Sequence, residues 1–273
     1  MLSDRPMHAR PNILRCTPGT GWSRAGHVGS RILPGTFEKG CAVAEDSAEL
    51  QGVFGQRVRQ ELGLDSDRPD ALERAAGLVR TYSAGYTGEA FDTYGHNDPV
   101  QIAGDDLIAV SMLSIHIREQ GTSSMRPSSI RTLERLAGSI TELLAAVPTD
   151  RDLHTLSEAE FDRWLGPGSA GDVLYWLLRK QAAIPRVAVY KLLARKRLAL
   201  FPIRDTVVEK TLGQTADPWW RPWWETLARD PELVAHLEEI RRRSGAEHLS
   251  LLRVADIVIW MTHHPSGQAE TAE

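Results

Sequence analysis

Between Leu174 and Gly213 the chain reads LYWLLRKQAAIPRVAVYKLLARKRLALFPIRDTVVEKTLG. Two prolines divide this stretch, and each predicts a joint between short helices. Pro185 ends one helix and is tolerated in the first turn of the next. Pro202 holds the residue before it in extended geometry, so a third helix is expected to begin near Asp205. The Asp205 carboxylate suits an N-cap, because it can accept the free amide hydrogens of the first helical turn.

The second joint resembles a segment of the helix-hairpin-helix superfamily of base-excision DNA glycosylases. In that superfamily a Val-Asp-Thr-His type segment carries the catalytic aspartate, and residues 201–208, which read FPIRDTVV, match it. The resemblance implies an all-α fold with a helix-hairpin-helix-like centre, DNA as the partner, and Asp205 as the catalytic residue. In such enzymes the aspartate stabilises the cationic sugar or activates the attacking water.

The hairpin that precedes this segment in the superfamily has the pattern apolar-Pro-Gly-Val-Gly, and residues 183–188 of this chain contain no glycine. Hairpin glycines let backbone amides approach a phosphate closely. The lysine nucleophile of the bifunctional members falls on Val187 or Tyr190, so lyase chemistry through a Schiff base is not implied. Lys191 stands next to one of these positions and is expected to point elsewhere on its helix.

Three longer segments are similar to a family of functionally uncharacterised actinobacterial proteins, and this is the closer match. The segments are 105–114 (DDLIAVSMLS), 191–197 (KLLARKR) and 250–261 (SLLRVADIVIWM). The similarity extends over residues 80–264. It implies no activity, because none is assigned to that family.

Basic residues concentrate in the same central stretch, although the whole chain has a formal charge of −4. No acidic residue occurs between Arg179 and Arg204. Such a patch can bind phosphate and predicts a nucleic-acid surface. The alternative is a solvated helix face whose cations are balanced by acidic neighbours. The nucleic-acid-binding candidates are Arg186, Lys191, Arg195, Lys196, Arg197 and Arg204.

Aromatic residues gather at two other places, and both are candidates for a pocket that stacks on a base. The first is the connection over residues 82–94, and the second is the sequence WWRPWW at residues 219–224. The pocket candidates are Tyr86, Phe91, Tyr94, Trp220 and Trp224. Packing is the alternative function of both clusters, because aromatic side chains commonly anchor loops and terminal helices to a core.

Apolar residues recur at helical spacing through most of the chain, and no alternating strand pattern is present. Further helices are expected from Asp46, from Pro69, from Asp105 or Asp106 to Ile117, over 128–147, from the capping box at Ser157, over 230–244 and over 251–262. The prediction is therefore an all-α protein, a single globular domain of about ten helices over residues 46–264. Residues 1–45 and 265–273 are expected to be disordered.

The sequence gives no support for a metal site, a cofactor site or a membrane location. Cys16 and Cys41 are the only cysteines, and their spacing matches no metal motif. His263 and His264 are adjacent and point apart, so no metal or cofactor site is expected. The chain has no long apolar run and no leader-like core near its start, so we expect a cytoplasmic protein without a membrane partner.

The sequence thus favours a nucleic-acid-associated protein with a degenerate helix-hairpin-helix glycosylase-like core, and DNA is its expected partner. One alternative is an active monofunctional DNA glycosylase that uses Asp205. The other is a small-molecule or protein-binding helical domain. Whether the protein is an enzyme stays open on the sequence alone, and so does its oligomeric state.

Overall fold

The structure is a computed structural model that describes residues 52–120, 124–215 and 217–264. By its internal contacts the chain divides into Met1–Ala42 and Val43–Glu273, and all described residues belong to the second unit. Within the described residues there are helices and no strand, apart from an isolated β-bridge between Ile117 and Met125. The predicted all-α class is confirmed. The two predicted disordered segments lie outside the described residues, and so does the expected helix start at Asp46.

The helices are short, and five of them begin at a residue whose side chain caps the first turn. The first described helix covers residues 52–61. The α-helices that follow are α2 (Ala71–Gly85), α3 (Gly104–Met112), α4 (Pro127–Arg135), α5 (Ala137–Ala145), α6 (Glu158–Trp164), α7 (Ala170–Trp176), α8 (Arg186–Lys196), α9 (Thr206–Leu212), α10 (Trp220–Leu227), α11 (Pro231–Ser244) and α12 (Leu251–His263). Two 3₁₀ segments, η1 (Thr87–Phe91) and η2 (Leu153–Thr155), and a π-helical turn, η3 (Leu177–Gln181), complete the set.

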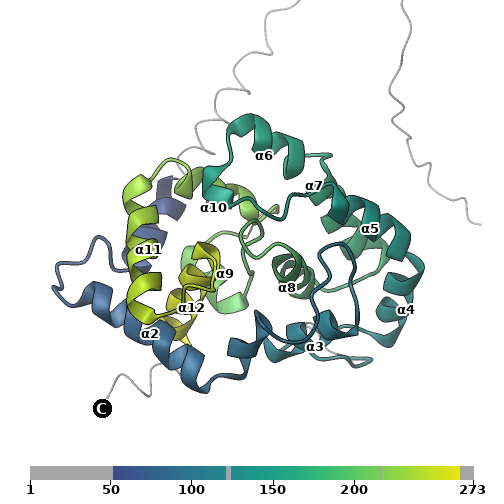
Figure 1. Cartoon of the computed structure of the whole chain (residues 1–273), viewed down its shortest axis with the longest axis horizontal. Coiled ribbons are helices and arrows are strands. Elements are labelled where there is room, and N and C mark those ends of the chain that lie inside the picture. The colour runs from purple at the N-terminus through teal and green to yellow at the C-terminus, as the bar shows by residue number, and fades with distance from the viewer. Residues whose placement is uncertain (1–51, 121–123, 216, 265–273) are drawn as a thin grey trace, which may run out of the picture. The chain divides into compact units, whose positions relative to one another are not determined.

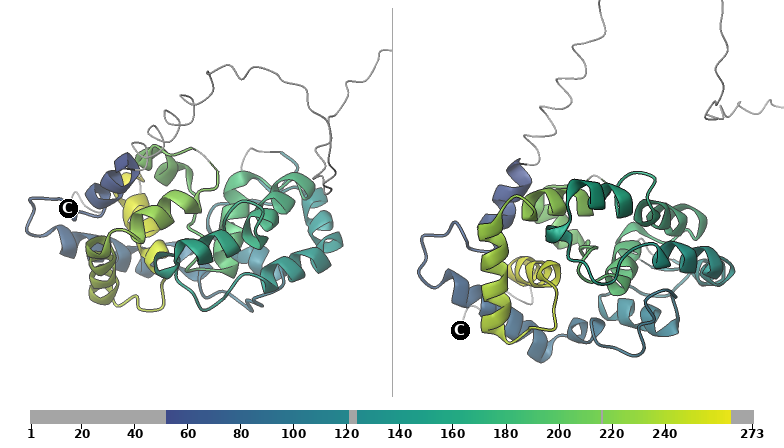
Figure 2. Two further views of the ribbon diagram at one scale, coloured as in Figure 1. Left: turned by 90° about the horizontal axis from the view of Figure 1, so that it is seen from above. Right: turned by 45° about the horizontal axis from the view of Figure 1, so that its top comes forward.

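Helices α8 and α12 each pack against several other helices. The C-terminal helix α12 packs against α2, α9 and α11, which are distant from one another in the sequence. Helix α8 packs against α3, α7 and η3, and α5 lies along α7 (Figures 1 and 2). Nearly every residue of α8 is buried. Helices α8 and α12 are therefore the internal helices that position the site described below.

The two proline joints form as the sequence predicts. Helix α8 begins directly after Pro185, and the turn before it contains Ala183 in the left-handed region at φ 53°. Asp205 is the N-cap of α9, where its Oδ1 accepts the N–H of Val207 at 2.9 Å. Gly213 ends α9 in left-handed geometry, at φ 65°. That conformation suits glycine, because it has no Cβ.

Some predicted helix boundaries are wrong, and the backbone shows why. The helix expected over 128–147 is two helices, because Leu136 leaves helical geometry at ψ 3° and Gly138 follows in the first turn of α5. The helix expected to reach Ile117 ends at Met112, because Ser114 adopts a φ of 62°. Its N-cap is Ala103 and not an aspartate. The predicted capping box at Ser157 is present.

The tryptophan cluster belongs to the core. Trp219, Trp220 and Trp223 are fully buried, and Trp224 is nearly so. The Trp220 Nε1–H donates to the carbonyl of Leu165 at 2.9 Å, so the one polar atom of this indole is satisfied inside the protein. The four rings hold α10 against the interior. Packing is therefore the role that the structure supports for this cluster.

Candidate polar cavity

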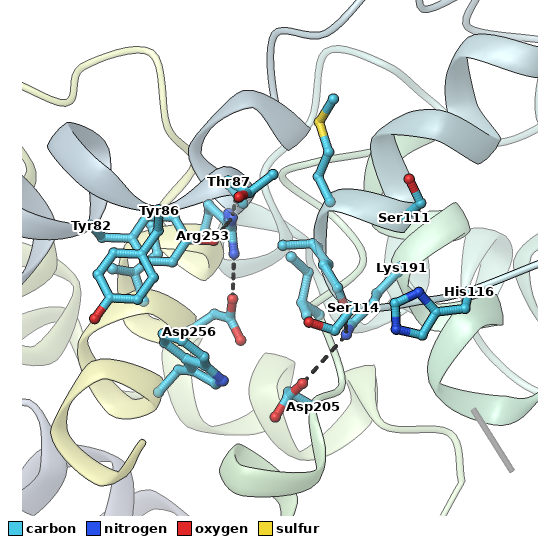
Figure 3. Close-up of a pocket in the computed structure, with 16 residues that line it drawn as sticks. Tyr82, Tyr86, Thr87, Ser111, Ser114, His116, Lys191, Asp205, Arg253 and Asp256 are labelled. Atoms are coloured by element: carbon cyan, nitrogen blue, oxygen red, sulfur yellow. Dashed lines mark hydrogen bonds and ion pairs between the residues drawn. The ribbon is translucent and has the colours of Figure 1, made fainter. Parts of the chain in front are cut away.

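A cavity of about 310 Å³ lies where α2, the end of α3, α8, α9 and α12 meet. Figure 3 shows one acidic and one basic side chain on each of two sides of it: Lys191 with Asp205, and Arg253 with Asp256. A volume near 300 Å³ is at the lower end of the range for small-molecule sites. The cavity is lined by Tyr82, Tyr86, Thr87, Gly88, Ser111, Met112, Leu113, Ser114, His116, Lys191, Ile203, Asp205, Arg253, Asp256, Ile257 and Trp260.

One side of the cavity carries an ion pair between α8 and the start of α9. The Lys191 Nζ lies 3.3 Å from the Asp205 Oδ2 and donates to the carbonyl of Leu113 at 2.7 Å. Because the other Asp205 oxygen caps α9, this carboxylate is held in one orientation. Burial lowers the pKa of the Lys191 ammonium, and the attraction of Asp205 and Asp256 opposes that shift. The pair is available to a ligand, since both residues line the cavity.

The opposite side is built around Arg253 of α12, whose guanidinium is buried and donates four hydrogen bonds. Its Nη1 donates to the Asp256 Oδ2 at 2.6 Å, and its Nε donates to the Asp92 Oδ2 at 3.0 Å. Its Nη2 donates to the Tyr82 hydroxyl at 2.9 Å and to the carbonyl of Gly88 at 3.0 Å. The arginine therefore fixes Asp256 and Tyr82 beside the cavity and ties η1 to α12.

Two tyrosines and a tryptophan form an aromatic wall. The rings of Tyr82 and Tyr86 are stacked, with centroids 5.4 Å apart and planes 3° from parallel. The Trp260 ring stands edge-on to Tyr86, at a centroid distance of 5.6 Å. Tyr86 and Trp260 are both half-buried, so they present ring surface to the cavity. Aromatic faces of this kind bind flat, unsaturated ligands such as bases.

The structure brings three of the predicted site residues into this cavity, namely Asp205, Lys191 and Tyr86. Lys191, which the sequence places next to one possible position of the superfamily's nucleophile, points toward Asp205, with its Nζ 3.3 Å from the Oδ2. Phe91 is fully buried in the core, and Tyr94 packs on the core outside the cavity. Trp220 and Trp224 also lie in the core and do not line the cavity.

The predicted basic surface does not form at most of its residues, because their side chains point into the protein. The Lys196 Nζ lies 2.6 Å from the Asp106 Oδ1, and both side chains have zero exposure. The Arg204 guanidinium is bound to Glu209 and Asp217, and its side chain is equally buried. The expected balance by acidic neighbours holds for these residues, but inside the core and not on a solvated face.

Two further arginines from this stretch hold loops to α8. Arg195 donates to the carbonyls of Phe91, Asp92 and Tyr94. Arg197 donates to the carbonyls of Pro99, Leu144 and Val147. Carbonyl groups of loops need such donors when they are buried. Arg186 is the exception among the six candidates, since it is about one-third exposed, and it pairs with Glu209 at 2.8 Å.

Sequence reasoning missed the residues that α12 contributes. Arg253 and Asp256 are three positions apart in the apolar run LLRVADIVIWM, so they share one helix face. A charged pair within an otherwise apolar helix was the available signal, because buried charges need partners. Among the described residues, no group of three or more His, Cys, Asp or Glu side chains is arranged to hold a metal ion.

Fold and site together define an all-helical protein with a polar, aromatic-walled cavity of small-molecule size. The chain belongs to a family of unknown function, DUF6308, whose model matches residues 75–263. This confirms the expected membership of a family without assigned activity. No curated protein and no solved structure matches the chain. No described helix combines the length and apolar character needed to cross a membrane.

Proposed function

We propose that the cavity binds one nucleobase or nucleoside, and that the protein hydrolyses an N-glycosidic bond with Asp205 as the working carboxylate. The observation that supports this most directly is the Lys191–Asp205 pair at 3.3 Å inside an aromatic-walled cavity. The proposal agrees with the resemblance of residues 201–208 to the aspartate segment of helix-hairpin-helix DNA glycosylases.

The chemistry needs a carboxylate that stays ionised and does not rotate. Asp205 has one oxygen fixed by the amide of Val207 and the other facing Lys191. A carboxylate in this position can stabilise the positive charge that develops on the sugar as the bond to the base breaks. It can also accept the proton of an attacking water. Lys191 supplies a cation 3.3 Å from this carboxylate.

The aromatic wall supplies the platform for the base. Tyr86 and Trp260 offer ring faces at half-buried positions, and stacking is worth about 1–3 kcal/mol per base. For a base within a nucleic acid, the nucleotide would have to be turned out of its stack to enter a cavity of this size. The Ser111 and Ser114 side chains line the cavity on the side of Lys191, away from this platform (Figure 3).

A free nucleoside is the second candidate substrate, and the inward direction of the basic side chains favours it. A protein that holds a nucleic-acid backbone needs exposed cations for the phosphates. Lys196 and Arg204 are buried and internally paired, so neither is available for that purpose. Lys180, on η3, is exposed and is a phosphate candidate if the substrate is DNA.

The test is a base-release assay on two substrate panels, one of duplex oligonucleotides with damaged bases and one of free nucleosides. Chromatography of the released bases identifies the substrate class. We expect Asp205→Asn to lower the release rate at least ~100-fold. The matched control is Asp230→Asn, because Asp230 caps α11 through the amide of Leu233 and lies outside the cavity. Release that survives in Asp205→Asn would contradict the proposal.

A further inference from the structure

Asp256 has one satisfied and one unsatisfied oxygen, and the residue lines the cavity. Its exposure is 5%, so the carboxylate is buried by protein. The Oδ2 accepts from the Arg253 Nη1 at 2.6 Å, whereas the Oδ1 accepts no hydrogen bond from any residue that the structure describes. Figure 3 places Asp256 across the cavity from Lys191 and Asp205. Asp256 lines the cavity, so a ligand there can approach this carboxyl group, whose Oδ1 has no hydrogen-bond partner among the described residues.

Arg253 holds the Asp256 carboxylate in place through the Oδ2 and forms no hydrogen bond with the Oδ1. A buried polar atom without a partner costs about 1–3 kcal/mol. The Arg253 Nε and Nη2 are engaged by Asp92, Tyr82 and the carbonyl of Gly88, so neither donates to this oxygen. Unsatisfied groups that persist inside a cleft are typical of sites that bind or react with a ligand.

Burial is the main influence on the protonation of Asp256. Burial raises the pKa of the Asp256 carboxyl to about 6; Arg253 and Lys191 oppose the shift, and Asp205 adds to it. The other titratable groups that face the same cavity are Tyr82 and His116. Two carboxyl groups of one cavity thus have different environments, which is the arrangement that separates an acid from a base.

We propose that Asp256 shares a proton with a ring nitrogen of the bound base and transfers it to the base as the glycosidic bond breaks. This inference rests on the proposed function and adds the general acid to it. The bond electrons go to the base, which takes the Asp256 proton and leaves neutral. Water forms the new bond to the sugar carbon, and Asp205 takes its proton. The proton then returns to Asp256 through solvent.

The first arm of the test compares Asp256→Asn with the wild-type protein in the base-release assay. The amide keeps the size of the carboxyl group and an acceptor for Arg253, but it cannot transfer a proton. We expect kcat to fall at least ~100-fold with KM within about threefold. We also expect the wild-type rate to decline as pH rises above about 6, and this slope to be absent in the variant. Asp172→Asn, outside the cavity, is the control and should match the wild type.

An unchanged kcat in Asp256→Asn, or the same pH slope in both proteins, would overturn the role of Asp256 and leave the proposed function standing. If Asp256→Asn does not fold, the pH profile of the wild type is the test. A rate of base release that stays constant between about pH 5 and about pH 8 would then overturn the role of Asp256.

The second arm decides the role of Asp256 if the wild-type protein releases no base from either panel, an outcome that refutes the proposed function. Adenine, whose ring nitrogens can accept a proton, is titrated into both proteins while the fluorescence of Trp260 and the other tryptophans is followed. We expect wild-type affinity to weaken about tenfold per pH unit above about pH 6 and the affinity of Asp256→Asn to be independent of pH. The absence of base binding, or equal pH dependence in both proteins, would overturn the inference.

Discussion

Replacing Lys196 by methionine should destabilise the protein strongly, although a lysine within a basic stretch reads as a surface residue. Its ammonium forms an ion pair with the Asp106 Oδ1 at 2.6 Å and donates to the Asn97 Oδ1 at 2.9 Å and to the carbonyl of Asp98 at 3.0 Å. Methionine fills a similar volume without a charge. It leaves the buried Asp106 carboxylate facing an apolar side chain, and it removes two of the hydrogen bonds between residues 97–98 and α8.

The magnitude follows from the burial of the pair. Removing one partner of a buried ion pair costs about 3–5 kcal/mol, because the remaining charge stays uncompensated. A domain of this kind has a total stability of about 5–15 kcal/mol, so a large part of it would be lost. At a urea dependence of about 2 kcal/mol per molar, the unfolding midpoint should fall by about 1.5–2.5 M.

Urea unfolding followed by far-UV circular dichroism measures this difference, with Lys180→Met as the matched control. Lys180 is exposed on η3, with its Nζ 5.4 Å from the centre of the Trp176 ring. Its replacement should change stability by no more than about 0.5–1 kcal/mol. A loss below about 1 kcal/mol for Lys196→Met, or equal losses for both variants, would refute the internal assignment of Lys196.

Three other changes have defined outcomes. Burial lowers the pKa of Lys191, so between the lowered pKa and 10.5 the unfolded chain binds more protons than the folded protein. The free energy of unfolding of the wild type should therefore rise as pH increases toward 10.5. Urea titrations of Lys191→Met at the same pH values should lack this rise. The raised pKa of Asp256, about 6 against 3.8, should make stability fall as pH increases from about 4 to about 6, and thermal unfolding of Asp256→Asn should lack that slope. Trp220→Ala should cost about 3–5 kcal/mol in urea unfolding, whereas Trp176→Ala, at a 41% exposed position, should cost far less. Similar losses for the two tryptophan variants would contradict the buried position of Trp220.

Local signals in the sequence predicted the helices well. Proline at 185 and aspartate at 205 act through the backbone of their own turn, so no knowledge of distant residues was needed to place these boundaries. The capping box at Ser157 is of the same kind. Ser114 could not be predicted as the end of α3, because a left-handed serine is stabilised only by its surroundings.

The direction of the basic side chains depends on contacts between distant segments. Lys196 is 90 positions from Asp106, and the Arg195 acceptors lie about 100 positions away on the loop after η1. Charge counting along the chain treats these cations as exposed, since nothing local indicates that a loop folds over α8. For the same reason, a charge reversal at Arg195 and Lys196 would unfold the protein and could not report on nucleic-acid binding.

The candidate site was predictable in part. Asp205 and Tyr86 could be named from a motif and an aromatic loop. Asp256 could not, because its role depends on α12 packing against α9 and α2 to close the cavity. Lys191 was among the candidates of the basic stretch, but helix geometry alone did not predict its ion pair with Asp205.

The rate of base release by the wild-type protein and by Asp205→Asn is the most direct test of the proposed site. Single-turnover assays on the oligonucleotide and nucleoside panels, with Asp230→Asn as the cap control, separate loss of chemistry from loss of a helix cap. The account predicts release by the wild type and by Asp230→Asn, and a rate at least ~100-fold lower for Asp205→Asn. Equal rates for the three proteins, or no release by any of them, would contradict it.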